Sequence, residues 1–135
     1  ARLDQAMRDS YHAADSTALP EQVFQRLVSQ DIAGLRLRLA PSLRLVRSRW
    51  PIFSIWAANH EGDPAPRPGA EDVLILRPEF DPRPYPLPQG GADLIAALLA
   101  GESLGDSLDR VAGPVDLTAT LGLLISGRAI VGVEE

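Results

Sequence analysis

The chain has 135 residues, of which 45% are hydrophobic, so it suits one folded domain and not a disordered segment. It has no cysteine and only two histidines, which excludes a disulfide framework, a zinc ribbon and a thiol nucleophile and argues against a metal or cofactor site. The sequence lacks a long apolar run and a signal-peptide pattern, so we expect a cytoplasmic protein without a membrane partner.

Charge is distributed unevenly along the chain. The net charge is −5, and all thirteen basic residues are arginine. Residues 1–50 hold eight arginines and five acidic residues, whereas residues 90–135 hold two arginines and seven acidic residues. Only the first part is therefore expected to attract phosphate or an acidic peptide. The helical pattern already includes the first residues, which indicates a fragment or a processed product.

The first 28 residues carry two helical patterns. Apolar residues recur at spacings of four and three in a stripe predicted to dock on a neighbouring surface, namely Leu3, Met7, Tyr11 and Ala14. Pro20 then stands at the start of a second short helix, because proline is well tolerated in a first helical turn. Its apolar face consists of Val23, Phe24, Leu27 and Val28.

Alternating leucine and arginine residues follow, at 35–39 and 43–49. An alternation with period two predicts strands with one buried face, so we expect a two-stranded arginine-rich β-ribbon. The arginines form either a solvated outer face or a binding surface for an acidic partner, and the alternation favours neither. The candidate binding residues are Arg36, Arg38, Arg44, Arg47 and Arg49, together with the aromatic residues Trp50 and Trp56.

The middle of the chain contains a loop and a hairpin. Residues 51–59 fit either a helix or a short strand, and 60–70 form a proline-rich loop, so we divide the chain into 1–59, a loop at 60–71, and 72–135. Strands at 72–77 and 83–87 are predicted to form an antiparallel hairpin. Prolines at 82, 84, 86 and 88 share one parity, so their missing N–H groups block one edge of the second strand.

The last third predicts three helices and a strand. Gly101 ends a helix at 92–100, Ser103 caps a helix at 104–112, and Asp116 caps a helix that Gly127 ends. A strand follows at 129–133. The predicted fold class is therefore α+β, with N-terminal helices and the arginine-rich ribbon packed on a winged-helix-like C-terminal unit.

Several separated segments resemble the C-terminal half of HvfC/BufC-type proteins, and the resemblance spans nearly the whole chain. Residues 35–39 read LRLRL, 41–45 PSLRL, 47–51 RSRWP and 54–56 SIW; segments 1–4, 11–15, 98–105 and 116–117 also fit. Ala40 departs from the pattern, because many relatives have histidine there. Relatives also carry an upstream helical domain, labelled DNA-binding, which we expect this chain to lack.

The resemblance implies a non-catalytic partner subunit of a multinuclear non-haem iron oxygenase that modifies cysteine-containing peptides. Such a subunit would present a ribosomally made precursor peptide to the oxygenase, often in copper handling. An extended peptide can add a strand to an open sheet edge, which we expect at 73–77 or at 130–133.

A winged-helix transcriptional regulator that binds DNA is the alternative function. A winged helix is a familiar DNA reader, and the arginine-rich ribbon would supply phosphate contacts. The candidate recognition helix at 116–126, however, has no arginine before Arg128. The acidic balance of this segment also argues against DNA binding.

Overall fold

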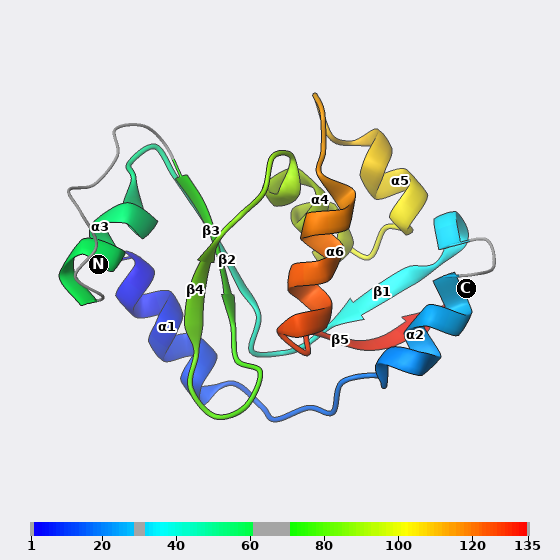
Figure 1. Ribbon diagram of the computed structural model, residues 1–135, viewed down its shortest axis with the longest axis horizontal. Coiled ribbons are helices and arrows are strands. Elements are labelled where there is room, and N and C mark those ends of the chain that lie inside the picture. Colours follow the sequence, from blue (N-terminus) through cyan, green and yellow to red (C-terminus); the bar gives the residue numbers. More distant parts are fainter. Residues whose placement is uncertain (1, 29–31, 61–70, 135) are drawn as a thin grey trace.

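A computed structural model describes residues 2–28, 32–60 and 71–134 of the chain. In chain order its elements are α1 (Arg2–His12), α2 (Glu21–Val28), a 3-10 helix η1 (Ile32–Gly34), β1 (Arg36–Leu39), β2 (Arg44–Ser48), α3 (Ile52–His60), β3 (Glu71–Leu76), β4 (Arg83–Pro86), α4 (Gly91–Leu99), α5 (Leu104–Asp109), α6 (Leu117–Ser126) and β5 (Ile130–Glu134). The α+β class is confirmed (Figure 1). The predicted loop lies outside the described residues, apart from His60 at the end of α3 and Glu71 at the start of β3.

The strands form two antiparallel sheets, and the predicted arginine-rich ribbon is wrong. β1 pairs with β5, whereas β2 pairs with β3 in a three-stranded sheet of order β2-β3-β4. Between β1 and β2 the Leu43 N–H donates to Ala40 O at 3.1 Å, and the Ala40 N–H donates to Ala129 O at 2.7 Å. This turn bends the chain without folding β2 back along β1, so each strand finds its partner elsewhere (Figure 1).

The hairpin of β3 and β4 is confirmed. Pro86 lies opposite Val73 and Pro84 opposite Ile75, and the Leu87 N–H donates to Asp72 O at 3.0 Å. The residues between the prolines therefore bond inward, as predicted from their parity, and the prolines stand on the outer edge of the sheet.

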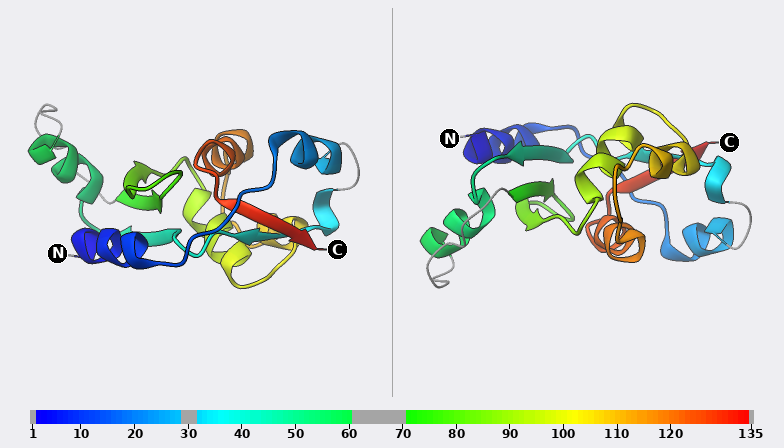
Figure 2. Two further views of the ribbon diagram at one scale, coloured as in Figure 1. Left: turned by 90° about the horizontal axis from the view of Figure 1, so that it is seen from below. Right: turned by 90° about the horizontal axis from the view of Figure 1, so that it is seen from above.

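Helices cover both faces of the three-stranded sheet. Val46, Val73 and Ile75 face α1 and α3, where they form a core with Leu3. On the other face Leu74 and Leu76 belong to a larger core that includes residues from α2, α4, α5 and α6. β3 contributes to both cores, and its residues 73–76 are completely buried, because it is the central strand (Figures 1 and 2).

Two helix caps are confirmed, and so is the end of α6 at Gly127. Ser103 Oγ accepts from the Asp106 N–H at 3.2 Å, and Asp116 Oδ1 accepts from the Ala119 N–H at 3.0 Å. The residue with left-handed backbone angles at this end is Arg128, with φ 54°. Gly127 has right-handed backbone angles, and glycine is required there because a Cβ would overlap the Leu76 side chain.

The apolar stripe of α1 is partly wrong. Leu3 and Met7 pack against the sheet, but Tyr11 is 56% exposed and Ala14 lies beyond the helix end. Ser10 is buried in its place. The helical period accounts for this, because Ser10 lies seven residues after Leu3 and so falls on the same face, whereas Tyr11 is rotated away from it.

Several other element predictions are resolved by the structure. Residues 52–60 form a helix, and α5 ends at Asp109, three residues earlier than predicted. The closing strand β5 pairs with β1, whereas β2 completes the sheet of the hairpin. Each sheet thus joins strands from both sides of the 60–71 loop. No helix among the described residues has the length and apolarity to span a membrane.

Candidate functional site

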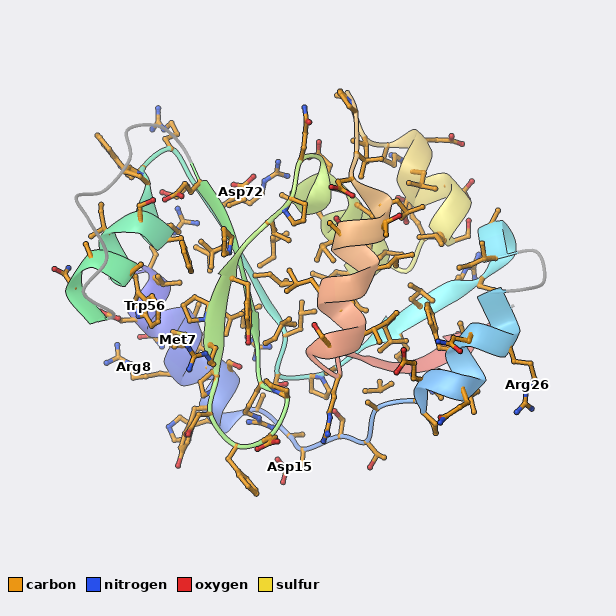
Figure 3. The ribbon with its side chains drawn as sticks, viewed as in Figure 1. Met7, Arg8, Asp15, Arg26, Trp56 and Asp72 are labelled. Atoms are coloured by element: carbon orange, nitrogen blue, oxygen red, sulfur yellow. The ribbon has the colours of Figure 1, made fainter. Side chains whose placement is uncertain are left out.

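The structure places the seven predicted binding residues in four parts of the fold. Arg36 and Arg38 lie on β1, Arg44 and Arg47 on β2, and Arg49 and Trp50 directly after β2. Trp56 lies on α3 (Figure 3). The centroid of its ring is 6.0 Å from that of the Phe53 ring. They do not form a single arginine surface, because β1 and β2 belong to different sheets.

The arginines of β1 lie on the exposed face of the smaller sheet. The Arg38 guanidinium lies directly over Gly132 of β5, at a place where a side chain on that residue would overlap it. It continues to Glu134, with 3.2 Å between Arg38 Nη1 and Glu134 Oε1. Because both side chains are mostly exposed, this ion pair contributes little to stability.

The arginines of β2 bind groups of this chain. Arg44 Nη1 donates to Leu43 O at 2.8 Å and also to Pro41 O. Arg47 Nη2 donates to Asp93 Oδ1 at 2.9 Å, and its Nε lies 3.9 Å from Asp72 Oδ2. Arg47 thereby links the sheet to the first turn of α4.

One edge of the three-stranded sheet is open along β2. The Leu87 N–H donates to Asp72 O, so the main-chain groups of Asp72 point toward β4. Main-chain groups of an antiparallel strand alternate between its two sides, so those of Val73 point toward β2. Val46, which lies opposite Val73, therefore bonds to β3. Leu45 and Arg47 direct their N–H and C=O groups outward, and no hydrogen bond within the described ranges satisfies them.

An apolar pocket lies beside this edge. Its volume is about 530 Å³, and β2 and the residues after it contribute Val46, Ser48 and Trp50. Residues of α1 and α3 complete the wall, namely Arg2, Leu3, Asp4, Ile52, Ile55, Trp56 and Asn59. Trp50 is 72% exposed and Ile55 42% exposed, so both present apolar surface to an incoming side chain.

The two edges expected to be open are unsuitable. Strand 73–77 corresponds to β3, which has a partner on each side, so this expectation is wrong. The strand at 130–133 pairs with β1 on one side, and its Ile130 O already accepts from the Leu19 N–H at 2.9 Å. The first part of its outer edge is therefore covered by the segment that precedes α2.

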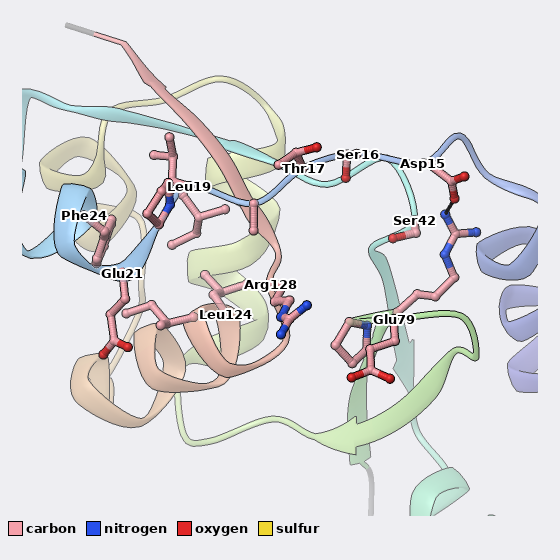
Figure 4. Close-up of a pocket in the computed structure, with 16 residues that line it drawn as sticks. Asp15, Ser16, Thr17, Leu19, Glu21, Phe24, Ser42, Glu79, Leu124 and Arg128 are labelled. Atoms are coloured by element: carbon pink, nitrogen blue, oxygen red, sulfur yellow. Dashed lines mark hydrogen bonds and ion pairs between the residues drawn. The ribbon is translucent and has the colours of Figure 1, made fainter.

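A second cleft, of about 450 Å³, lies between the segment before α2, the end of α6 and the residues after β3 (Figure 4). Arg77, whose side chain is 6% exposed, lines it and donates to Ser10 O, Tyr11 O, Ala13 O and Ala14 O at 2.7–3.1 Å and to Asp15 Oδ1 at 3.0 Å. All these partners belong to the end of α1 or directly follow it. Arg77 therefore stabilises the helix terminus, where carbonyl groups lack helical partners.

The described residues contain no group of three or more histidine, aspartate or glutamate side chains arranged to hold a metal ion. The sequence prediction missed the open edge of β2 and the role of Arg77. Alternate residues of β2 point outward, just as alternate residues of β4 do. This could not be used to find the open edge, because the sequence does not reveal that β2 pairs with the distant strand β3. Comparisons of the chain with protein-family models, with curated proteins and with solved structures gave no match.

Proposed function

We propose that this protein is a non-catalytic partner protein that binds an extended precursor peptide along β2 and presents it to a multinuclear non-haem iron oxygenase. The resemblance to HvfC/BufC-type proteins supports the identity of the two partners and a role in copper handling. We also propose that residues 72–135 form a winged-helix-like unit. The hairpin and the helices α4, α5 and α6 would form that unit.

The open edge of β2 beside the apolar pocket is the observation that carries the proposal. An added strand would bond to the outward N–H and C=O groups of Leu45 and Arg47. Its side chains would alternate between the two faces of the sheet. On one face they would meet the pocket beside Val46 and Trp50, and on the other they would meet Arg47 and Arg49. The main-chain bonds supply affinity, and the pocket supplies specificity.

The alternative of a DNA-binding regulator receives less support from the same observations. Arg38, Arg47 and Arg77 each pair with a carboxylate of this chain, which reduces the positive charge available to phosphates. Thr120 and Leu124 of α6 are fully buried, so part of the candidate recognition helix faces the core.

A parallel titration tests the proposal. The protein is titrated at physiological salt with a small cysteine-containing precursor peptide of the kind that the resemblance implies and, separately, with duplex DNA. We expect saturable peptide binding and no DNA binding. In Arg49→Glu, which changes an exposed side chain next to Trp50, we expect severalfold weaker binding of a peptide with acidic residues. DNA binding that weakens with salt, without peptide binding, would contradict the proposal.

A further inference from the structure

We propose that the cleft between the segment before α2, the end of α6 and the residues after β3 binds a small zwitterion, an α-amino acid with an aliphatic side chain. The volume of this cleft is about 450 Å³, which is typical of small-molecule sites. None of its lining residues belongs to the pocket beside β2. The inference is therefore independent of the proposed function.

Arg128, directly after α6, brings an unpaired positive charge to the cleft. Its side chain is exposed and points into the cleft (Figure 4). Its guanidinium forms no hydrogen bond or ion pair with any residue that the structure describes. The backbone φ of Arg128 is 54°, a left-handed conformation that glycine adopts most easily after a helix. Such strained residues concentrate at functional sites, so the strain and the free guanidinium together indicate a ligand.

Ser42, in the turn between β1 and β2, is an independent indication of a ligand. The residue is only 4% exposed, yet it lines the cleft, and its hydroxyl points toward the side on which Arg128 lies (Figure 4). This hydroxyl has no hydrogen-bond partner within the described ranges. A carboxylate held by the Arg128 guanidinium would accept a charge-assisted hydrogen bond from it.

The other charges of the cleft indicate that the ligand also carries a positive group. Arg77 and Asp15 pair with each other, with 3.0 Å between Arg77 Nη2 and Asp15 Oδ1. Glu21 and Glu79 are exposed and form no ion pair with a described residue. Arg83 borders the adjacent cavity, which also includes Glu79, but it does not line this cleft. These two carboxylates would repel a simple anion, whereas the ammonium group of a zwitterion would be attracted to them.

Apolar side chains line the inner part of the cleft and fit an aliphatic group. Leu19 and Ile125 both border it and pack against the larger core. The wall before α2 is fixed at both ends, because Arg77 binds Asp15 and the Leu19 N–H donates to Ile130 O at 2.9 Å. Little order is therefore lost when a ligand enters, and this preorganisation favours affinity.

Titration with L-leucine and two truncated analogues tests the chemistry of the ligand. Isocaproate lacks the ammonium group of leucine, and isopentylamine lacks its carboxylate. We expect saturable binding of leucine by NMR and at least about tenfold weaker binding of each analogue, because each loses one charge-assisted contact. Equal affinities for leucine and isocaproate would overturn the zwitterion assignment. No binding of leucine to the wild type would overturn the inference as a whole.

Variants of the two indicated residues test the position of the site. Arg128→Gln removes the charge and should weaken leucine binding at least about tenfold. Ser42→Ala should weaken it severalfold without loss of stability, because the hydroxyl has no partner in the described part of the chain. Arg8→Gln, at an exposed position of α1 outside the cleft, is the control and should bind like the wild type.

A glycine variant separates ligand binding from a structural role of Arg128. Arg128→Gly should lose leucine binding but raise the thermal midpoint, because glycine tolerates the left-handed conformation. An arginine that only stabilised the helix end would give a lower midpoint. Leucine binding that neither Arg128→Gln nor Arg128→Gly weakens would overturn the assignment of the ligand to this cleft.

Discussion

The two edges of the three-stranded sheet share one central strand but differ in what they offer to another chain. On β4, Pro84 and Pro86 occupy the outward positions and remove two N–H donors. On β2, Leu45 and Arg47 occupy the equivalent positions and keep theirs. A proline-blocked edge resists strand addition, whereas an edge with free donors permits it. The sheet is therefore closed to a peptide on one side and open on the other.

The largest effect is expected from a substitution in the core of β3, because both edge strands pair with β3. Leu74 of β3 is fully buried in the larger core, and β3 pairs with both edge strands. We expect Leu74→Ala to lower the free energy of unfolding by about 2–5 kcal/mol, because it leaves a cavity. Urea denaturation measures the loss. Leu99→Ala, at a half-exposed site, should change the same quantity by less than about 0.5 kcal/mol.

A matched pair of variants at Arg47 tests the open edge itself. Both Arg47→Ala and Arg47→Pro lose the ion pairs with Asp72 and Asp93, but only proline also removes the outward N–H. We expect the proline variant to bind the precursor peptide up to about tenfold more weakly than the alanine variant, because one main-chain hydrogen bond contributes up to about 1.4 kcal/mol. Isothermal titration gives both affinities. Equal affinities would show that the peptide does not bond to this edge.

The pocket beside β2 should contribute less than the main-chain bonds. Trp50→Ala removes an exposed indole from its wall, and we expect a loss of peptide affinity of about three- to tenfold with unchanged stability. Tyr11→Ala removes an aromatic side chain of similar exposure at the other end of α1 and is the control. If both variants bind alike, the pocket has no part in recognition.

The smallest effect is expected from opening the blocked edge. Pro86→Ala restores one outward N–H at an exposed position of β4, and stability should change by less than about 0.5 kcal/mol. Analytical ultracentrifugation should then detect a slight concentration-dependent rise in mass, since a freed edge can pair with another copy. A mass that stays constant at high concentration would mean that Pro86 does not protect the edge.

Local features of the fold were predictable from the sequence. The hairpin, the capped starts of α5 and α6 and the position of α4 depend on turn, cap and glycine signals that act over a few residues. The parity of the prolines likewise placed them on an outer edge. Each of these predictions concerns neighbours in the chain, where propensity and local hydrogen bonds dominate.

The errors concern partners that lie far apart in the sequence. The alternation of leucine and arginine showed that residues 36–39 and 44–48 are strands, but period two does not identify the pairing strand. Leu37 pairs with Val133, almost a hundred residues later, and Val46 pairs with Val73. The hydrogen bonds from Arg77 to the end of α1 likewise join residues more than sixty positions apart. The wrong strand pairing also led to the wrong candidate edges, because the open edge can be identified only when the strand order is known.

Amide hydrogen exchange of β2 tests the central claim most directly. In the free protein we expect rapid exchange at Leu45 and Arg47, whose N–H groups point outward, and slow exchange at Val46, which bonds to β3. Saturating precursor peptide should slow exchange at Leu45 and Arg47 by at least about tenfold and leave Val46 unchanged. Protection of Leu45 and Arg47 in the free protein, or exchange that the bound peptide does not alter, would contradict strand addition at this edge.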